Sequence, residues 1–151
     1  MVMNLKALLD RPVESAKRPT LKPAGTYTGS IASFKFDESS QKKTPFVRLT
    51  VKNCQPGENI TPESLKDEDG ETMDLSKWAP YEDYYLTEDA LYRVRELMES
   101  LRMNFAGRQF NEMIPELVNQ AVMFEFVHET ITDRQTNEAR IVGKIGQMKG
   151  A

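Results

Sequence analysis

The chain has 151 residues, of which 39% are hydrophobic and 28% are charged, and its formal net charge is −3. This length and composition predict one globular domain with an ordinary hydrophobic core. The mild charge favours no class of partner, and no apolar stretch predicts a transmembrane helix or a signal peptide. The single cysteine, Cys54, excludes an internal disulfide and indicates a reducing compartment, so we expect a cytoplasmic protein without a membrane partner.

Residues 1–25 are expected to form a basic arm. Five basic and two acidic residues lie in it, and its segment "MNLKALLDR" has Leu5, Leu8 and Leu9 at helical spacing. Prolines then interrupt the chain. The sequence therefore predicts a short amphipathic helix in this arm, followed by a domain over residues 26–151 with an acidic insertion at residues 55–83.

An antiparallel hairpin is expected to open the domain. Residues 26–36 are rich in β-branched and aromatic side chains, which is typical of a strand, and Gly29 within them predicts a bulge or a sharp coil of the strand. Residues 44–54 alternate between apolar and polar positions. The alternation predicts a buried face with Val47, Leu49 and Val51, and an outward face with Phe46, Arg48, Thr50 and Lys52.

Residues 55–83 differ in character from the rest of the chain. Nine acidic and two basic residues lie there, with prolines and glycines between them. The pattern predicts a long, mostly irregular insertion whose end is anchored by Trp78 and Tyr81. Its run "DEDGETMD" lacks the spacing of a calcium-binding loop, so we expect a solvated acidic segment. Two interpretations stay open, a disordered solubilising loop and a surface that contacts a partner or competes for a cationic face.

A short strand and a helix follow the insertion. The segment "DYYL" at residues 83–86 predicts the third strand, and Thr87 is the expected N-cap of the helix. Gly107 is expected to end or interrupt this helix, and residues 109–120 predict a second helical element broken by Pro115. The buried stripe of the first helix is expected to contain Leu91, Val94, Met98 and Leu101.

The chain is expected to close with two more strands. In residues 121–131 one face is predicted to carry Val122, Phe124, Phe126 and His128, and in residues 138–148 one face is predicted to carry Ile141, Gly143 and Ile145. The resulting order is mainly β, with five strands and a helix between the third and the fourth. That order predicts the five-stranded barrel of the oligonucleotide/oligosaccharide-binding (OB) fold, in which the helix covers one end.

The sequence carries no pattern typical of a catalytic site. It has no glycine-rich phosphate loop, no paired histidine motif and no CxxC pair. His128, among phenylalanines, is expected to be structural, and Cys54 is expected to be an inert thiol. We therefore expect no enzyme activity, no cofactor and no metal; a nuclease assembled from scattered carboxylates is the alternative left open.

Aromatic and basic residues gather on the outward face of the first hairpin and near it. Single-stranded nucleic acid binds to such a mixture because bases stack on rings while Lys and Arg contact phosphates. The candidate binding residues are Phe34, Lys35, Phe36, Lys42, Lys43, Phe46, Arg48, Lys52, Tyr85, Arg140 and Lys144. Phe34 and Phe36 could instead be core residues, Phe46 and Arg48 could form a solvated face, and either Tyr84 or Tyr85 could point inward.

Three segments of the chain resemble phage single-stranded DNA-binding proteins of the OB-fold, DUF669-like type. They are "LKPAGTYTGSIASFKF", "YYLTEDALYRVRELMESL" and "FNEMIPELVNQAVMFEFVHETITDRQTNEARIVGKI". The resemblance covers residues 20–147 apart from the acidic insertion. It implies a non-catalytic protein that coats single-stranded DNA during phage replication or recombination in the host cytoplasm, with replication or recombination proteins, or a second copy of the chain, as further partners.

A second function remains open from the sequence. The same barrel could be a protein-interaction module, such as a phage inhibitor or adaptor that acts on a host protein, with the acidic insertion as its contact surface. The chain ends in "GKIGQMKGA", which lacks the acidic tail through which many single-strand-binding proteins recruit partners.

Overall fold

A computed structural model describes residues 5–15 and 20–151. The protein is mainly β, with one five-stranded antiparallel sheet in the order β3-β2-β1-β4-β5 and a helix between β3 and β4. The strands are β1 (Gly25–Glu38), β2 (Pro45–Pro56), β3 (Tyr81–Tyr85), β4 (Ala121–Thr132) and β5 (Ala139–Gly150). The helices are α1 (Leu5–Leu9), α2 (Leu91–Ser100) and α3 (Phe110–Met113), with 3-10 turns η1 (Val13–Ser15), η2 (Pro62–Leu65) and η3 (Ile114–Leu117).

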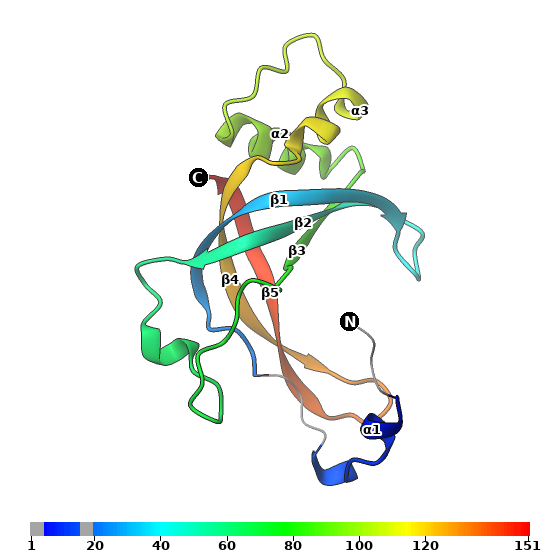
Figure 1. Cartoon of the computed structure of the whole chain (residues 1–151). Coiled ribbons are helices and arrows are strands. Elements are labelled where there is room, and N and C mark those ends of the chain that lie inside the picture. Colours follow the sequence, from blue (N-terminus) through cyan, green and yellow to red (C-terminus); the bar gives the residue numbers. More distant parts are fainter. Residues whose placement is uncertain (1–4, 16–19) are drawn as a thin grey trace.

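The long first strand organises the sheet. Nearly its whole length, from Tyr27 to Glu38, pairs with β2, and its first part, from Gly25 to Ser30, also pairs with β4. The strand is strongly curved (Figure 1). β3 and β5 are the two edges; they approach each other, but no backbone ladder joins them in the described part of the chain. Helices α2 and α3 lie together at one end of the sheet, and α1 lies at the other end (Figure 1). Among residues 5–15 and 20–151, no helix is long and apolar enough to cross a membrane.

The bulge predicted at Gly29 is confirmed. The register between β1 and β2 shifts between Thr28 and Ser30, and again between Ile31 and Ser33. A Cβ atom on Gly29 would lie 2.7 Å from Val51 Cγ1 and 2.9 Å from the carbonyl oxygen of Lys52. Glycine is therefore required where the strand bends closely over its partner.

The predicted buried face of β2 is also confirmed. Val47, Leu49 and Val51 are fully buried, together with Tyr27 and Ile31 of β1. β4 and β5 complete the core, and a bulge at Gly146 turns both Ile145 and Met148 inward. Ile141 and His128 alternate in phase with the core residues, but both are exposed because the β4–β5 hairpin extends beyond the core.

The boundaries predicted for α2 were wrong at both ends. The helix begins at Leu91 after a turn, and Thr87 contributes its backbone oxygen, which accepts from the N–H groups of Ala90 and Leu91. The helix ends at Ser100, where Arg102 adopts a φ of 57° and the N–H of Met103 closes back on Met98, well before Gly107.

The buried stripe of α2 also differs from the prediction. Val94 and Met98 are buried as expected, but the third buried residue is Leu97, whereas Leu91 and Leu101 are half-buried. α2 therefore contacts the sheet with its central turns and not along its whole length. The second helical element is confirmed, because α3 passes into η3 at Ile114, and Pro115 is the second residue of η3.

The acidic insertion is mostly irregular, as predicted, and is built from hydrogen-bonded turns. Thr61 caps η2 by accepting from the N–H of Ser64, and Asp67 accepts from the N–H groups of Asp69 and Glu71. Leu65, Leu75 and Trp78 pack against the core. The acidic side chains are thereby held on the surface by a backbone that is attached to the domain.

Candidate nucleic-acid interface

The outer surface of β2 and β3 is the first part of the candidate site. The register places Phe46 opposite Tyr85, Arg48 opposite Asp83 and Thr50 opposite Tyr81. Because side chains alternate along β3, Tyr84 points into the core and is 3% exposed, while Tyr85 points outward and is 43% exposed. The structure therefore decides which of the two tyrosines faces outward.

Phe46 is on this side of the sheet, but its ring is covered. Only 8% of the residue is exposed. The ring of Tyr85 meets it edge to face at 6.0 Å between centroids, and the guanidinium carbon of Arg48 lies 5.6 Å from its centroid. Phe46 thus faces outward, as predicted, but its ring is not open to a base, because the longer side chains of Tyr85 and Arg48 cover it. Phe46 supports Tyr85 from below.

Arg48 is held in place on two sides. Its Nε and Nη2 donate to the two carboxylate oxygens of Asp83 at 2.8 and 3.0 Å, which is the bidentate geometry that guanidinium groups favour. Its Cζ atom lies 3.9 Å from the ring centroid of Tyr81. The hydrogen bond to Asp83 raises the pKa of Arg48 above its usual value. Arg48 is therefore a compensated charge and not an open cation.

Phe34, Lys35 and Phe36 do not form one patch. Phe34 pairs with Leu49 and Phe36 with Val47, so both rings lie on the core side of the sheet, while Lys35 pairs with Arg48 on the outer side. Phe34 packs against the core, and Phe36 is exposed at the strand end, where it contacts the Phe34 ring. Strand alternation explains this separation.

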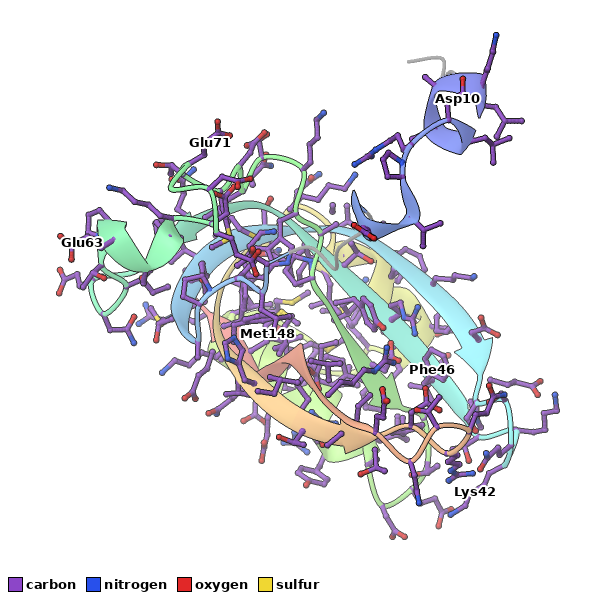
Figure 2. All side chains as sticks on the ribbon, turned by 90° about the horizontal axis from the view of Figure 1, so that it is seen from below. Asp10, Lys42, Phe46, Glu63, Glu71 and Met148 are labelled. Carbon is purple, nitrogen blue, oxygen red and sulfur yellow. The ribbon has the colours of Figure 1, made fainter. Side chains whose placement is uncertain are left out.

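Exposed lysines flank the outer surface. Lys52 is exposed near the end of β2, and Lys35 makes only an exposed contact of 3.6 Å with Asp37. Lys42 and Lys43 lie in the turn between β1 and β2, and Lys42 lines a shallow hollow with Tyr85. Lys42 and the acidic Glu63 and Glu71 of the insertion lie at opposite sides of the molecule (Figure 2).

A groove of about 700 Å³ is the second part of the candidate site. Its walls are residues 20–22 before β1, residues 78–81 leading into β3, and residues 140–145 of β5. Arg140 and Lys144, both predicted as binding residues, lie here. The other side chains of interest in its lining are Lys22, Trp78, Tyr81, Phe126 and Ile141.

Two hydrogen bonds fix the wall that precedes β1. The Nε2–H of His128 donates to the carbonyl oxygen of Lys22 at 2.8 Å, and the hydroxyl of Tyr27 donates to that of Pro23 at 2.6 Å. Trp78 forms the floor of the groove beside this wall. The centroid of its ring lies 4.9 Å from that of the Tyr27 ring, and Lys22 Nζ lies 5.9 Å from the Trp78 centroid. His128 thus has a structural role, as expected from the sequence.

The groove contains cations that are open to a ligand. In the described part of the chain, no carboxylate lies within 4 Å of the charged groups of Lys22 and Arg140. Lys144 contacts Glu129 at 2.9 Å, but both side chains are about half exposed, so water and salt weaken that pair. Weakly compensated cations beside aromatic rings suit a phosphate-bearing ligand. Arg140 and Lys144 are exposed, and Lys22 is half-buried.

Two further observations concern metal ligands and the cysteine. No three His, Cys, Asp or Glu side chains of residues 5–15 and 20–151 gather in a geometry that could hold a metal ion. Burial raises the pKa of the Cys54 thiol to about 11, so the thiolate that would act as a nucleophile is scarce at neutral pH.

Sequence reasoning assigned Trp78 and Tyr81 only to anchoring the insertion, and it did not assign Lys22 to binding. The signal for Tyr81 is present in "YEDYY", where Tyr81, Asp83 and Tyr85 alternate onto one face. Lys22 and Trp78 carry no such signal, because they meet Arg140 only after folding.

Comparison of the chain with protein-family models, with curated proteins and with solved structures finds no significant match.

Proposed function

We propose that the chain is a non-catalytic single-stranded DNA-binding protein that coats DNA during phage replication or recombination in the host cytoplasm. The observation that carries this proposal is the continuity of two exposed tyrosines on β3 with the cationic groove. Tyr81 is 50% exposed and lines that groove, and Tyr85 lies about 13 Å further along the same strand face. Stacking rings next to open cations are what a single strand requires.

A closed barrel is part of the same proposal. We infer an OB barrel in which β3 and β5 close the sheet. The strand order, the position of α2 between β3 and β4, and the approach of β3 to β5 support that inference. In an OB barrel the ligand lies over the second and third strands and nearby loops.

Oligonucleotide binding tests the proposal. Fluorescence anisotropy with labelled oligo-dT should give saturable binding that weakens as salt rises, with a slope of about −0.7 per phosphate contacted. A duplex of equal length serves as the control and should bind more weakly, because its bases are not free to stack. Equal or stronger binding to the duplex would contradict a single-strand interface.

The ordered acidic insertion favours a second candidate, a protein-interaction module. Its backbone is fixed to the domain by Leu65 and Leu75, so its carboxylates form a defined surface. On that alternative, oligonucleotides do not bind, and a host protein captured by the wild type is lost when Glu63, Glu68 and Glu71 are changed to Gln.

A further inference from the structure

The Tyr81 ring is covered on one face from within the protein. The Arg48 guanidinium lies against one face, with Cζ 3.9 Å from the centroid. The side chain is nevertheless half exposed and lines the groove. One ring face is therefore occupied from within the protein, while the residue keeps exposed surface and lines the groove that Lys22, Arg140 and Lys144 also line.

We propose that Tyr81 is the platform on which one base of the bound strand stacks, and that Arg48 is a positioning residue that holds the ring from behind. This inference rests on the proposed single-strand binding and goes beyond it, because it separates the residue that meets a base from the residues that meet phosphates.

The contacts of Arg48 exclude it as a free phosphate ligand. Two of its donors are used by Asp83 in a bidentate pair, and its planar group is stacked on Tyr81. Contact with a phosphate would require the arginine to leave both partners and would leave Asp83 uncompensated beside the strand. A planar, braced guanidinium instead fixes the ring orientation before the base arrives, which reduces the ordering required on binding.

The groove cations supply the phosphate contacts in this arrangement. Lys22, Arg140 and Lys144 line the same groove as Tyr81. Salt dependence should therefore depend on these three residues, whereas stacking should depend on Tyr81 and on the pair behind it. This division of roles can be measured.

The experiment measures oligo-dT affinity over a series of salt concentrations for the wild type and for Y81A, Y81F, R48K and the double variant R48A/D83A. The double variant keeps the net charge unchanged. Y81A should lose about tenfold to a hundredfold in affinity, the range expected for one stacked base, and Y81F should retain it. R48K and R48A/D83A should bind several-fold more weakly with an unchanged salt slope.

The control is Y92A, because Tyr92 is an exposed tyrosine on α2 outside the groove lining; its affinity should equal that of the wild type. Unchanged affinity of Y81A would overturn the platform. A salt slope that is shallower by about 0.7 in R48A/D83A would overturn the positioning role and make Arg48 a phosphate contact. If the wild type itself binds no single strand, the proposed function fails, which is a separate outcome from either of these.

Discussion

At the scale of single residues, the cations near the candidate site fall into two groups. Arg48 and Arg93 are held by acids at 2.8 Å, whereas Lys22 and Arg140 face the groove without an ion-pair partner among the described residues. The acid pairs of Arg48 and Arg93 must break before these arginines can contact a phosphate, whereas Lys22 and Arg140 have no such pair to lose. The pair of Lys144 with Glu129 is half exposed, so water and salt weaken it. Residue type alone therefore does not identify the cations that are available to a ligand.

Replacing Lys22, Arg140 or Lys144 with Ala should reduce the salt dependence of oligo-dT binding. Each lost phosphate contact should make the slope of log affinity against log salt shallower by about 0.7. Lys149→Ala is the matched control, because Lys149 is an exposed lysine of β5 that lies outside the groove. Anisotropy titrations at several salt concentrations provide the slopes, and an equal change in Lys149→Ala would argue for a diffuse charge effect instead of a groove.

Glu82 and Arg93 join β3 to α2. Arg93 Nη2 donates to Glu82 Oε1 at 2.8 Å, and the glutamate side chain is mostly covered. Burial raises the pKa of Glu82 from its usual 4.5, and the pairing with Arg93 only partly opposes that effect. The folded protein consequently holds the proton more tightly than the unfolded chain. This contribution to stability is fully present below pH 4.5 and is lost as the pH rises through the raised value.

Glu82→Gln should remove this pH dependence. The free energy of unfolding of the variant, minus that of the wild type, should therefore increase as the pH rises above 4.5 through the titration of Glu82. Urea denaturation at a series of pH values measures the difference, and Glu96→Gln on the exposed side of α2 corrects for the loss of one carboxylate. A difference that falls over the same range would contradict the assigned sign.

At the scale of elements, strand alternation was the most informative property of the sequence. It predicted the buried face of β2 and the antiparallel hairpin, and the glycine within the first strand predicted the bulge, because each depends on neighbours within one strand or one turn. The start of α2 was not predictable in the same way. Thr87 has the chemistry of an N-cap, but the chain makes a turn there before the helix begins at Leu91. That turn depends on the position and direction of the chain where β3 ends.

Gly29→Ala tests the bulge. The added methyl group would meet Val51 and the backbone oxygen of Lys52 at less than 3 Å, so the variant should lose about 1–3 kcal/mol of stability. In the control, Gly146→Ala, the new carbon would lie 3.2 and 3.4 Å from the methyl groups of Val127 and 3.7 Å from the backbone oxygen of Glu125, so the loss should be smaller. Chemical denaturation of both variants decides the point; equal losses would mean that the close approach at Gly29 does not constrain the bend.

At the scale of the whole molecule, the site depends on contacts between distant segments. The Arg48–Asp83 pair joins residues 35 apart in sequence, and the groove joins residues 20–22, 78–81 and 140–145. Sequence patterns placed Arg140 and Lys144 among the binding candidates but could not bring them to Lys22 and Trp78. Nor could they show that Asp83 compensates Arg48, because that requires the register between β2 and β3.

The negative electrostatic potential of the acidic insertion should weaken DNA binding. Its carboxylates repel phosphates, and at low salt this repulsion extends over about 10 Å or more. Changing the exposed Glu63, Glu68 and Glu71 to Gln should therefore increase oligo-dT affinity several-fold at low salt and leave it unchanged at high salt. Anisotropy at two salt concentrations measures the effect; reduced affinity in the variant would contradict a repulsive role.

The protein contains its own fluorescent probe for the proposed binding of single-stranded DNA in the groove. Trp78 is the one tryptophan of the sequence, and it lines the groove beside Lys22. Titration with oligo-dT should change its fluorescence to saturation, and added salt should reverse the change, because the strand lies against the ring and is held by phosphate contacts. Binding detected by anisotropy while Trp78 fluorescence stays constant would contradict the claim, since the strand would then lie elsewhere on the molecule.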